Sequence, residues 1–279
     1  MRSPLKFVIC IAVGIITAFF LSVCQCHAGA WTLPQGKLYE RIAVNYYFAD
    51  SEFSTQQDNK GFKKFSDLNV SNYLEYGITD RITLINAMYY KFLEKQALRE
   101  ELDSDGFGDV DLGLKGKLAE GSWGVLSTQG LVKIPGAYGK NDALPLGNGQ
   151  YDLDMRVLFG RSLWPYLPGY CNFEIGYRVR LEDPSDELRY LVEFGVDFTK
   201  ELYGRVKLDG ILSMDNGSSV STSGNPTATN NFDLGKLEMA VGFKLTKTWG
   251  LEFCIVPEIY GRNTTAGTTY TLALTYQTR

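Results

Sequence analysis

The stretch "LEYGITDRITLINAMYY" (74–90) decides the fold class of this sequence. Apolar and polar residues alternate on both sides of a short polar segment at residues 77–81. An alternation with a period of two places successive side chains on opposite faces, as in a β-strand with one apolar face. The stretch therefore predicts two antiparallel strands joined by a tight turn.

The same alternation recurs along the rest of the chain, in about twelve runs. One run sets apolar residues at odd positions against charged residues at even positions: Leu153, Met155 and Val157 against Asp152, Asp154 and Arg156. The connections alternate too. Short ones lie near residues 77–81, 119–123, 161–169, 199–202 and 245–249, and longer polar ones near residues 50–66, 93–107, 135–150, 215–231 and 261–268. We expect the segment 216–231, rich in Ser, Thr, Asn and Gly, to be a mobile loop tip.

A lipid bilayer explains this pattern. Inside a membrane every backbone N–H and C=O must be paired, so a sheet has to close on itself, with one face toward lipid and the other toward water. Aromatic residues near many run ends, such as Trp123, Trp164 and Trp249, suit the boundary between lipid and water. We predict an all-β protein, an antiparallel up-and-down transmembrane β-barrel of about twelve strands, with the short turns in the periplasm. The alternative is a secreted soluble β-sandwich, whose strands also alternate but which does not require this rhythm of loops.

The first thirty residues differ from the rest. Arg2 and Lys6 precede an apolar segment at residues 7–23, and small residues follow at 28–30. This is the arrangement of a secretory signal peptide. We therefore predict a signal peptide at residues 1–30 and a barrel at 31–279. An uncleaved anchor, or a lipid-modified cysteine at Cys24 or Cys26, would be the alternative.

Processing at this boundary changes the chemistry available to the chain. It removes the single histidine, His27, and leaves two cysteines, Cys171 and Cys254. The two cysteines lie on opposite parities of their runs, so we expect free thiols on opposite faces. Without a histidine, catalysis by a histidine base and zinc binding are both disfavoured. We therefore predict no enzymatic activity, no cofactor and no metal site.

The charge balance also excludes one class of partner. The chain has 28 Lys and Arg residues against 32 Asp and Glu residues, for a net charge of −4. Removal of Arg2 and Lys6 makes the predicted mature chain more acidic. Nucleic-acid binding favours dense basic clusters, so no nucleic-acid partner is expected.

Several motifs resemble a known family. The segments "EYGITDRITL" (75–84), "GFGDVDLGLKGKL" (106–118) and "FEIGYRVRLEDPSDEL" (173–188) resemble Gram-negative outer-membrane barrels of the transporter-like MetA-pathway phenol-degradation family and related barrels. The segment "GAWTLPQGKLYERI" (29–42) is similar to the mature start of a barrel family linked to surface polysaccharide. The resemblance implies an outer-membrane barrel and leaves the transported compound open.

Charged residues on the polar parity of the runs are the candidate site. They are expected to face the interior of the barrel, where they would form either a satisfied ion-pair network or a pore lining that biases which solutes pass. The predicted pore-lining residues are Asp109, Asp111, Lys115, Asp152, Asp154, Arg156, Glu174, Arg178, Arg180, Arg189, Glu193 and Arg205.

Two functions are consistent with these features. The first is a passive channel for small solutes through a narrow, charged lumen. The alternative is a non-conducting structural or surface-polysaccharide-associated barrel. Either would be located in the cell outer membrane, with outer-membrane lipid, lipopolysaccharide and the barrel-assembly machinery as partners, and the first would also have an unidentified small-molecule solute.

Overall fold

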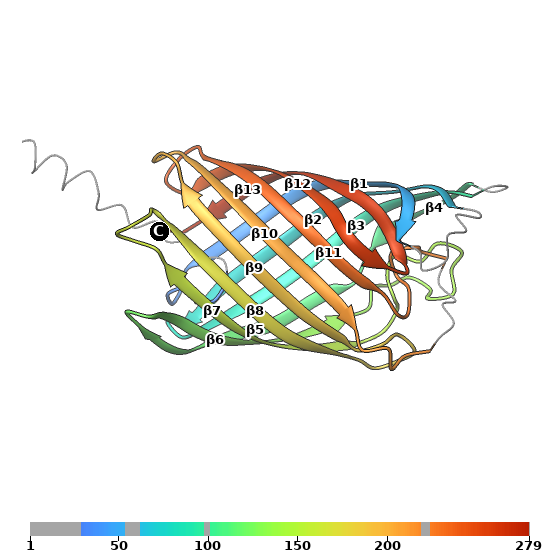
Figure 1. Ribbon diagram of the computed structural model, residues 1–279, viewed down its shortest axis with the longest axis horizontal. Coiled ribbons are helices and arrows are strands. Elements are labelled where there is room, and N and C mark those ends of the chain that lie inside the picture. Colours follow the sequence, from blue (N-terminus) through green and yellow to red (C-terminus); the bar gives the residue numbers. More distant parts are fainter. Residues whose placement is uncertain (1–28, 54–61, 98–100, 219–223, 279) are drawn as a thin grey trace, which may run out of the picture.

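A computed structural model describes residues 29–53, 62–97, 101–218 and 224–278. These residues form thirteen strands in one antiparallel sheet that closes into a barrel (Figure 1). The strands are β1 (Leu38–Phe53), β2 (Phe62–Thr79), β3 (Ile82–Ala97), β4 (Glu101–Phe107), β5 (Val110–Gly121), β6 (Gly124–Ile134), β7 (Asp152–Ser162), β8 (Gly169–Arg180), β9 (Glu187–Asp197), β10 (Leu202–Ser213), β11 (Asp233–Lys244), β12 (Trp249–Arg262) and β13 (Thr264–Gln277).

The barrel closes where β1 pairs with both β2 and β13. Strands β4 and β5 occupy a single position in the ring, because both pair with β3. Phe107 lies opposite Tyr90 and Asp111 lies opposite Ala87, so one extra residue is inserted between them as a bulge. The described barrel thus has twelve strand positions, and the predicted all-β barrel of about twelve strands is confirmed.

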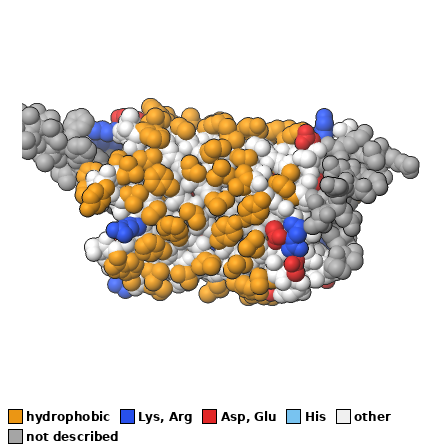
Figure 2. All heavy atoms as spheres, in the orientation of Figure 1, with side chains coloured by type: hydrophobic (Ala, Val, Ile, Leu, Met, Phe, Trp, Pro, Cys, Tyr) orange, Lys and Arg blue, Asp and Glu red, His pale blue; other side chains and the backbone are white. Residues whose placement is uncertain are grey.

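The two faces of the sheet differ as the alternation predicts. On β7, the apolar Leu153 and Val157 are 44% and 50% exposed, whereas Asp152 and Asp154 are 1% and 2% exposed. Figure 2 shows hydrophobic side chains over the middle of the visible outer face and charged side chains near its ends. An apolar outer band matches the hydrocarbon layer of a bilayer, and the charged side chains are left inside the barrel.

The connections gather at two ends. The short turns lie at one end with the last strand's C-terminus, and the longer segments lie at the other (Figure 1). Aromatic pairs mark the short-turn end, where the ring centroids of Trp249 and Tyr276 are 4.8 Å apart and those of Trp123 and Phe159 are 6.1 Å apart. We take this end as periplasmic and the other as extracellular. Among the described residues, no helix is long and apolar enough to cross a membrane.

Two of the predicted long loops are wrong. Residues 93–97 and 101–107 belong to the paired strands β3 and β4, and residues 261–268 contain only a turn at Asn263, with φ of 54°, between β12 and β13. The hydrophobic alternation weakens above the membrane boundary, but backbone pairing continues there because hydrogen bonding between strands does not depend on apolar side chains.

Candidate functional site: the charged interior of the barrel

All twelve predicted site residues project from the inner face of the sheet. Eleven of them form ion pairs there: Asp109, Lys115, Asp152, Asp154, Arg156, Glu174, Arg178, Arg180, Arg189, Glu193 and Arg205. The twelfth, Asp111, lines an internal cavity. The inward direction follows from the strand register, since each residue alternates with a neighbour exposed on the outer face.

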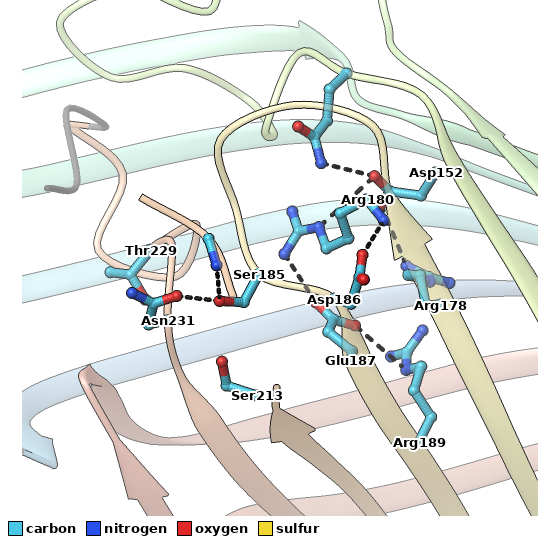
Figure 3. A network of polar contacts seen from close by, with 12 residues as sticks. Asp152, Arg178, Arg180, Ser185, Asp186, Glu187, Arg189, Ser213, Thr229 and Asn231 are labelled. Atoms are coloured by element: carbon cyan, nitrogen blue, oxygen red, sulfur yellow. Dashed lines mark hydrogen bonds and ion pairs between the residues drawn. The ribbon is translucent and has the colours of Figure 1, made fainter. Parts of the chain in front are cut away.

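A first network of ion pairs joins β7, β8 and β9 on the inner face, in the extracellular half of the barrel. Asp154 lies opposite Arg178 in the register, and its carboxylate is 3.0 Å from the Arg178 Nε and 2.8 Å from the Arg156 Nε. Arg180 donates to Glu187 at 2.8 Å, and its Nε lies 3.6 Å from Asp152 (Figure 3). Acidic and basic side chains alternate in this network. Many charges can therefore be buried together, because each charged partner compensates for part of the hydration that the other has lost.

The turn between β8 and β9 closes over this network. Asp186 in this turn accepts hydrogen bonds from the Arg180 N–H at 2.8 Å, from the Asn216 amide at 2.8 Å and from the Tyr177 hydroxyl at 2.9 Å. Burial acts to raise the pKa of Asp186, but the hydrogen bonds from Arg180, Asn216 and Tyr177 outweigh it and lower the pKa below its ordinary value. Figure 3 shows Ser185 of this turn, whose hydroxyl donates a hydrogen bond to Asn231 of the loop between β10 and β11.

A second network lies nearer the periplasmic end and was not among the predicted site residues, apart from Arg205. The Arg205 Nη2 is 2.6 Å from Glu238 and 3.1 Å from Glu252. Arg41 also pairs with Glu252 at 3.0 Å, and Lys207 pairs with Glu238 at 2.8 Å. These residues share the polar parity of their strands, so the same alternation could have identified them.

An internal cavity of about 320 Å³ lies between the first network and the extracellular loops. Its walls carry five acidic and five basic side chains, so their formal charges cancel. The acidic ones are Asp67, Asp109, Asp111, Asp152 and Glu187, and the basic ones are Lys91, Lys133, Arg178, Arg180 and Arg189.

The loop between β6 and β7 folds into the extracellular mouth above this cavity. Leu144 and Leu146 of this loop are 2% and 3% exposed, and they pack against the inward-facing Phe65 and Leu93. Inside the barrel these four side chains form a small apolar core, which holds the loop by burial of apolar surface.

The loop between β10 and β11 also reaches inward, over its described residues. Asn225 is 1% exposed and donates its amide to the Pro145 carbonyl at 2.8 Å. The Lys95 Nζ donates to the Gly224 carbonyl at 2.6 Å. The expectation of a mobile tip across 216–231 is therefore wrong for residues 224–231, which are tied to the mouth of the barrel; residues 219–223 lie outside the described residues.

Residues 29–36 occupy the periplasmic mouth. Ala30 is completely buried, its N–H donates to the Asn172 Oδ1 at 3.0 Å, and its carbonyl accepts from the Ser127 hydroxyl at 2.5 Å. The Trp31 ring packs edge-on against Tyr170, with centroids 5.9 Å apart. An apolar cluster containing Val125 and Leu158 accommodates Ala30 and Trp31. The lumen is thus narrowed at both ends by segments that fold inward.

Lys115 is tied to this inserted segment. Its Nζ donates to the Gly29 carbonyl at 2.9 Å and lies 3.0 Å from the Glu75 Oε1. Both side chains are 1% exposed, so Lys115 lies beneath the segment and does not face open space.

The remaining candidate groups have simpler roles. Cys171 and Cys254 are free thiols, as predicted. Cys254 is 1% exposed and donates to the Glu252 carboxylate, on the inner face. Within the described part of the chain, no three His, Cys, Asp or Glu side chains converge as ligands for a metal ion.

The comparisons with known proteins bear on the fold. No protein-family model matches this sequence, and no curated protein does. An outer membrane channel from Pseudomonas putida F1 superposes with a TM-score of 0.69 and 14% identity, over 89% of this chain and 98% of that chain. The NanC porin matches with a TM-score of 0.55 and 6% identity, over 85% of this chain and 98% of that one. A KdgM porin in complex with disordered oligogalacturonate matches with a TM-score of 0.50 and 7% identity, over 86% and 99%. The fold is that of an outer-membrane β-barrel.

Proposed function

We propose that this protein is a narrow outer-membrane channel that lets small solutes diffuse through a charged lumen. The observation that carries the proposal is the cavity of about 320 Å³ inside the closed barrel, lined by five acidic and five basic side chains. A barrel that served only as a scaffold could fill its interior with apolar side chains, which burial favours over charges. An interior of mixed charge suits a path that water and polar solutes enter.

The dimensions support a narrow path. Eight-stranded barrels are filled by their own side chains, and barrels of sixteen or more strands leave wide aqueous channels. This barrel has twelve strand positions, and its two mouths are narrowed by residues 29–36 and by the loop that carries Leu144 and Leu146. We infer that only small solutes pass, and that the predicted pore-lining residues other than Lys115 border their path.

The second candidate is a non-conducting barrel whose extracellular loops carry the function. The same inserted segments favour it, because buried contacts such as Asn225 to Pro145 hold the two loops in the extracellular mouth. An enzymatic role has less support, since His27 is the only histidine of the whole sequence and lies in the predicted signal peptide.

Planar-bilayer recordings of the refolded protein separate the two candidates. A channel gives discrete current steps whose size grows with salt concentration. A non-conducting barrel stays silent, even though its circular dichroism shows a folded β-structure.

A further inference from the structure

Four charged residues that line the cavity beneath the extracellular loops have a buried atom without a hydrogen-bond partner in the described residues: Asp111, Asp152, Arg180 and Arg189. Asp152 and Arg180 make other close polar contacts, whereas Asp111 and Arg189 are poorly satisfied. Asp111 on β5 is the only one of the cavity's five acidic wall residues for which the described part of the chain provides no ion pair, and its Oδ1 has no hydrogen-bond partner there. A buried carboxylate oxygen without a partner loses its hydration with no compensation. The site is therefore short of a donor at Asp111.

Arg189 on β9 is short of an acceptor in the same cavity. Its nearest carboxylate oxygens, on Asp154 and Glu187, lie at 3.6 Å and 3.7 Å, and its Nε is buried without a hydrogen-bond partner in the described residues. A guanidinium group carries five N–H donors in a planar fork, which a carboxylate can accept in pairs. The Nε of the neighbouring Arg180 also lacks a hydrogen-bond partner in the described residues, but its Nη1 donates to Glu187 at 2.8 Å.

The two groups approach the cavity from different walls. Three strands, β6 to β8, separate β5 from β9 in the ring. Both residues nevertheless line the same cavity. A bound molecule would therefore meet a free acceptor on one side and free donors on the other.

We propose that this cavity is a binding site for a small zwitterion, a molecule that carries an ammonium group and a carboxylate a few atoms apart. The ammonium would bind Asp111 and the carboxylate would bind Arg189. The balanced wall charges support this class, because an ion of one sign would add net charge to a neutral enclosure. A cavity of about 320 Å³ also lies at the lower end of the range for small-molecule sites.

The inference rests on the proposed channel function only in that a solute must reach the cavity. Neutral amino acids at pH 7 are suitable probes, and L-valine has two close analogues that each lack one charged group. Isovalerate keeps the carboxylate without the ammonium, and isobutylamine keeps the ammonium without the carboxylate. The three share a branched apolar group, so differences in binding report the charged contacts.

The test is isothermal titration calorimetry of the full mature barrel in detergent micelles at pH 7. We expect L-valine to bind about tenfold more tightly than either analogue, since a hydrogen bond to a charged group contributes roughly that much. The Asp111→Asn variant should lose the preference for L-valine over isovalerate, and Arg189→Gln should lose the preference for L-valine over isobutylamine. Asp111→Asn preserves side-chain size and Arg189→Gln shortens the side chain, so circular dichroism is used to check that both variants fold.

The matched control is Asp197→Asn, which removes a carboxylate at the periplasmic end of β9 that pairs with Lys244 at 2.8 Å and does not line the cavity. It should leave the preference for L-valine unchanged. Equal binding of all three probes, binding of one analogue alone, or no binding would overturn the inference. If the barrel conducts but fails this binding test, the channel proposal stands and the zwitterion site is refuted. If the barrel passes no current but shows the expected binding preferences, the zwitterion site stands and the channel proposal is refuted.

Discussion

The Lys115 ammonium lies 3.0 Å from the Glu75 carboxylate, and both side chains are 1% exposed. The Tyr73 hydroxyl also donates to Glu75, at 2.5 Å. When one partner of a buried ion pair is removed, the other is left as an uncompensated buried charge. This pair therefore couples the stability of the barrel wall to the segment inserted in its periplasmic mouth.

We expect Glu75→Gln to lower the free energy of unfolding by about 3–5 kcal/mol, the usual cost of breaking a buried pair. Chemical denaturation of the protein in detergent micelles measures this. Lys117→Gln is the control, because the Lys117 to Glu120 pair at 2.7 Å is partly exposed and should contribute at most about 1 kcal/mol. Equal effects of the two substitutions would contradict the account.

The inserted segment also bears on processing of the exported chain. The sequence predicts a cut after Ala30, and this boundary stays a prediction. The contacts of Gly29 with Lys115 and of Ala30 with Asn172 and Ser127 favour a mature chain that keeps both residues. We therefore expect the intact mass of the protein from outer membranes to include Gly29 and Ala30. A mass that corresponds to a start at Trp31 would show that the predicted cut after Ala30 is used.

The apolar contacts of the extracellular loop should restrict the current. Leu146→Ala removes buried side-chain volume between the loop and the inner wall, and such substitutions cost about 2–5 kcal/mol where the space cannot collapse. We expect the loop to leave the mouth more often, which would raise the mean single-channel conductance and the number of current transitions. Leu153→Ala is the control, since Leu153 is 44% exposed on the outer face. Unchanged recordings for Leu146→Ala would show that the loop does not limit the current.

The charge network should set ion preference. Asp154 contacts Arg156, Arg178 and Arg189, so Asp154→Asn leaves three guanidinium groups with less compensation. We expect the reversal potential in a salt gradient to move toward that of chloride. The control is Lys140→Gln, which changes a half-exposed charge of the β6–β7 loop, paired with Glu182 at 2.7 Å. Identical reversal potentials for Asp154→Asn and the parent protein would place Asp154 outside the ion path.

The barrel wall could be predicted from the sequence because its signal is local. In a strand between lipid and an aqueous interior, polar and apolar residues must alternate with a period of two. The side of the sheet that Asp152 or Leu153 faces can therefore be predicted without knowing which strands are adjacent. The same rule placed all twelve predicted site residues on the inner face. The ion pairs among them could not be derived, because they depend on which strands are adjacent and in which register.

The filling of the two mouths could not be predicted in this way. Insertion of the β6–β7 loop depends on contacts between residues far apart in the chain, such as Leu144 with Phe65. A signal was nevertheless present, because Phe65, Leu93, Val125 and Leu158 are apolar residues on the inner face of the strands. Apolar side chains that face a wet lumen indicate that another segment of the chain covers them.

The central claim is that ions cross the barrel through its charged interior, and single-channel recording tests it most directly. Purified, refolded protein in a planar bilayer should give discrete, reproducible current steps, smaller than those of wide sixteen-stranded porins. A protein that is folded and inserted but passes no current over a wide voltage range would contradict the account and favour the non-conducting barrel.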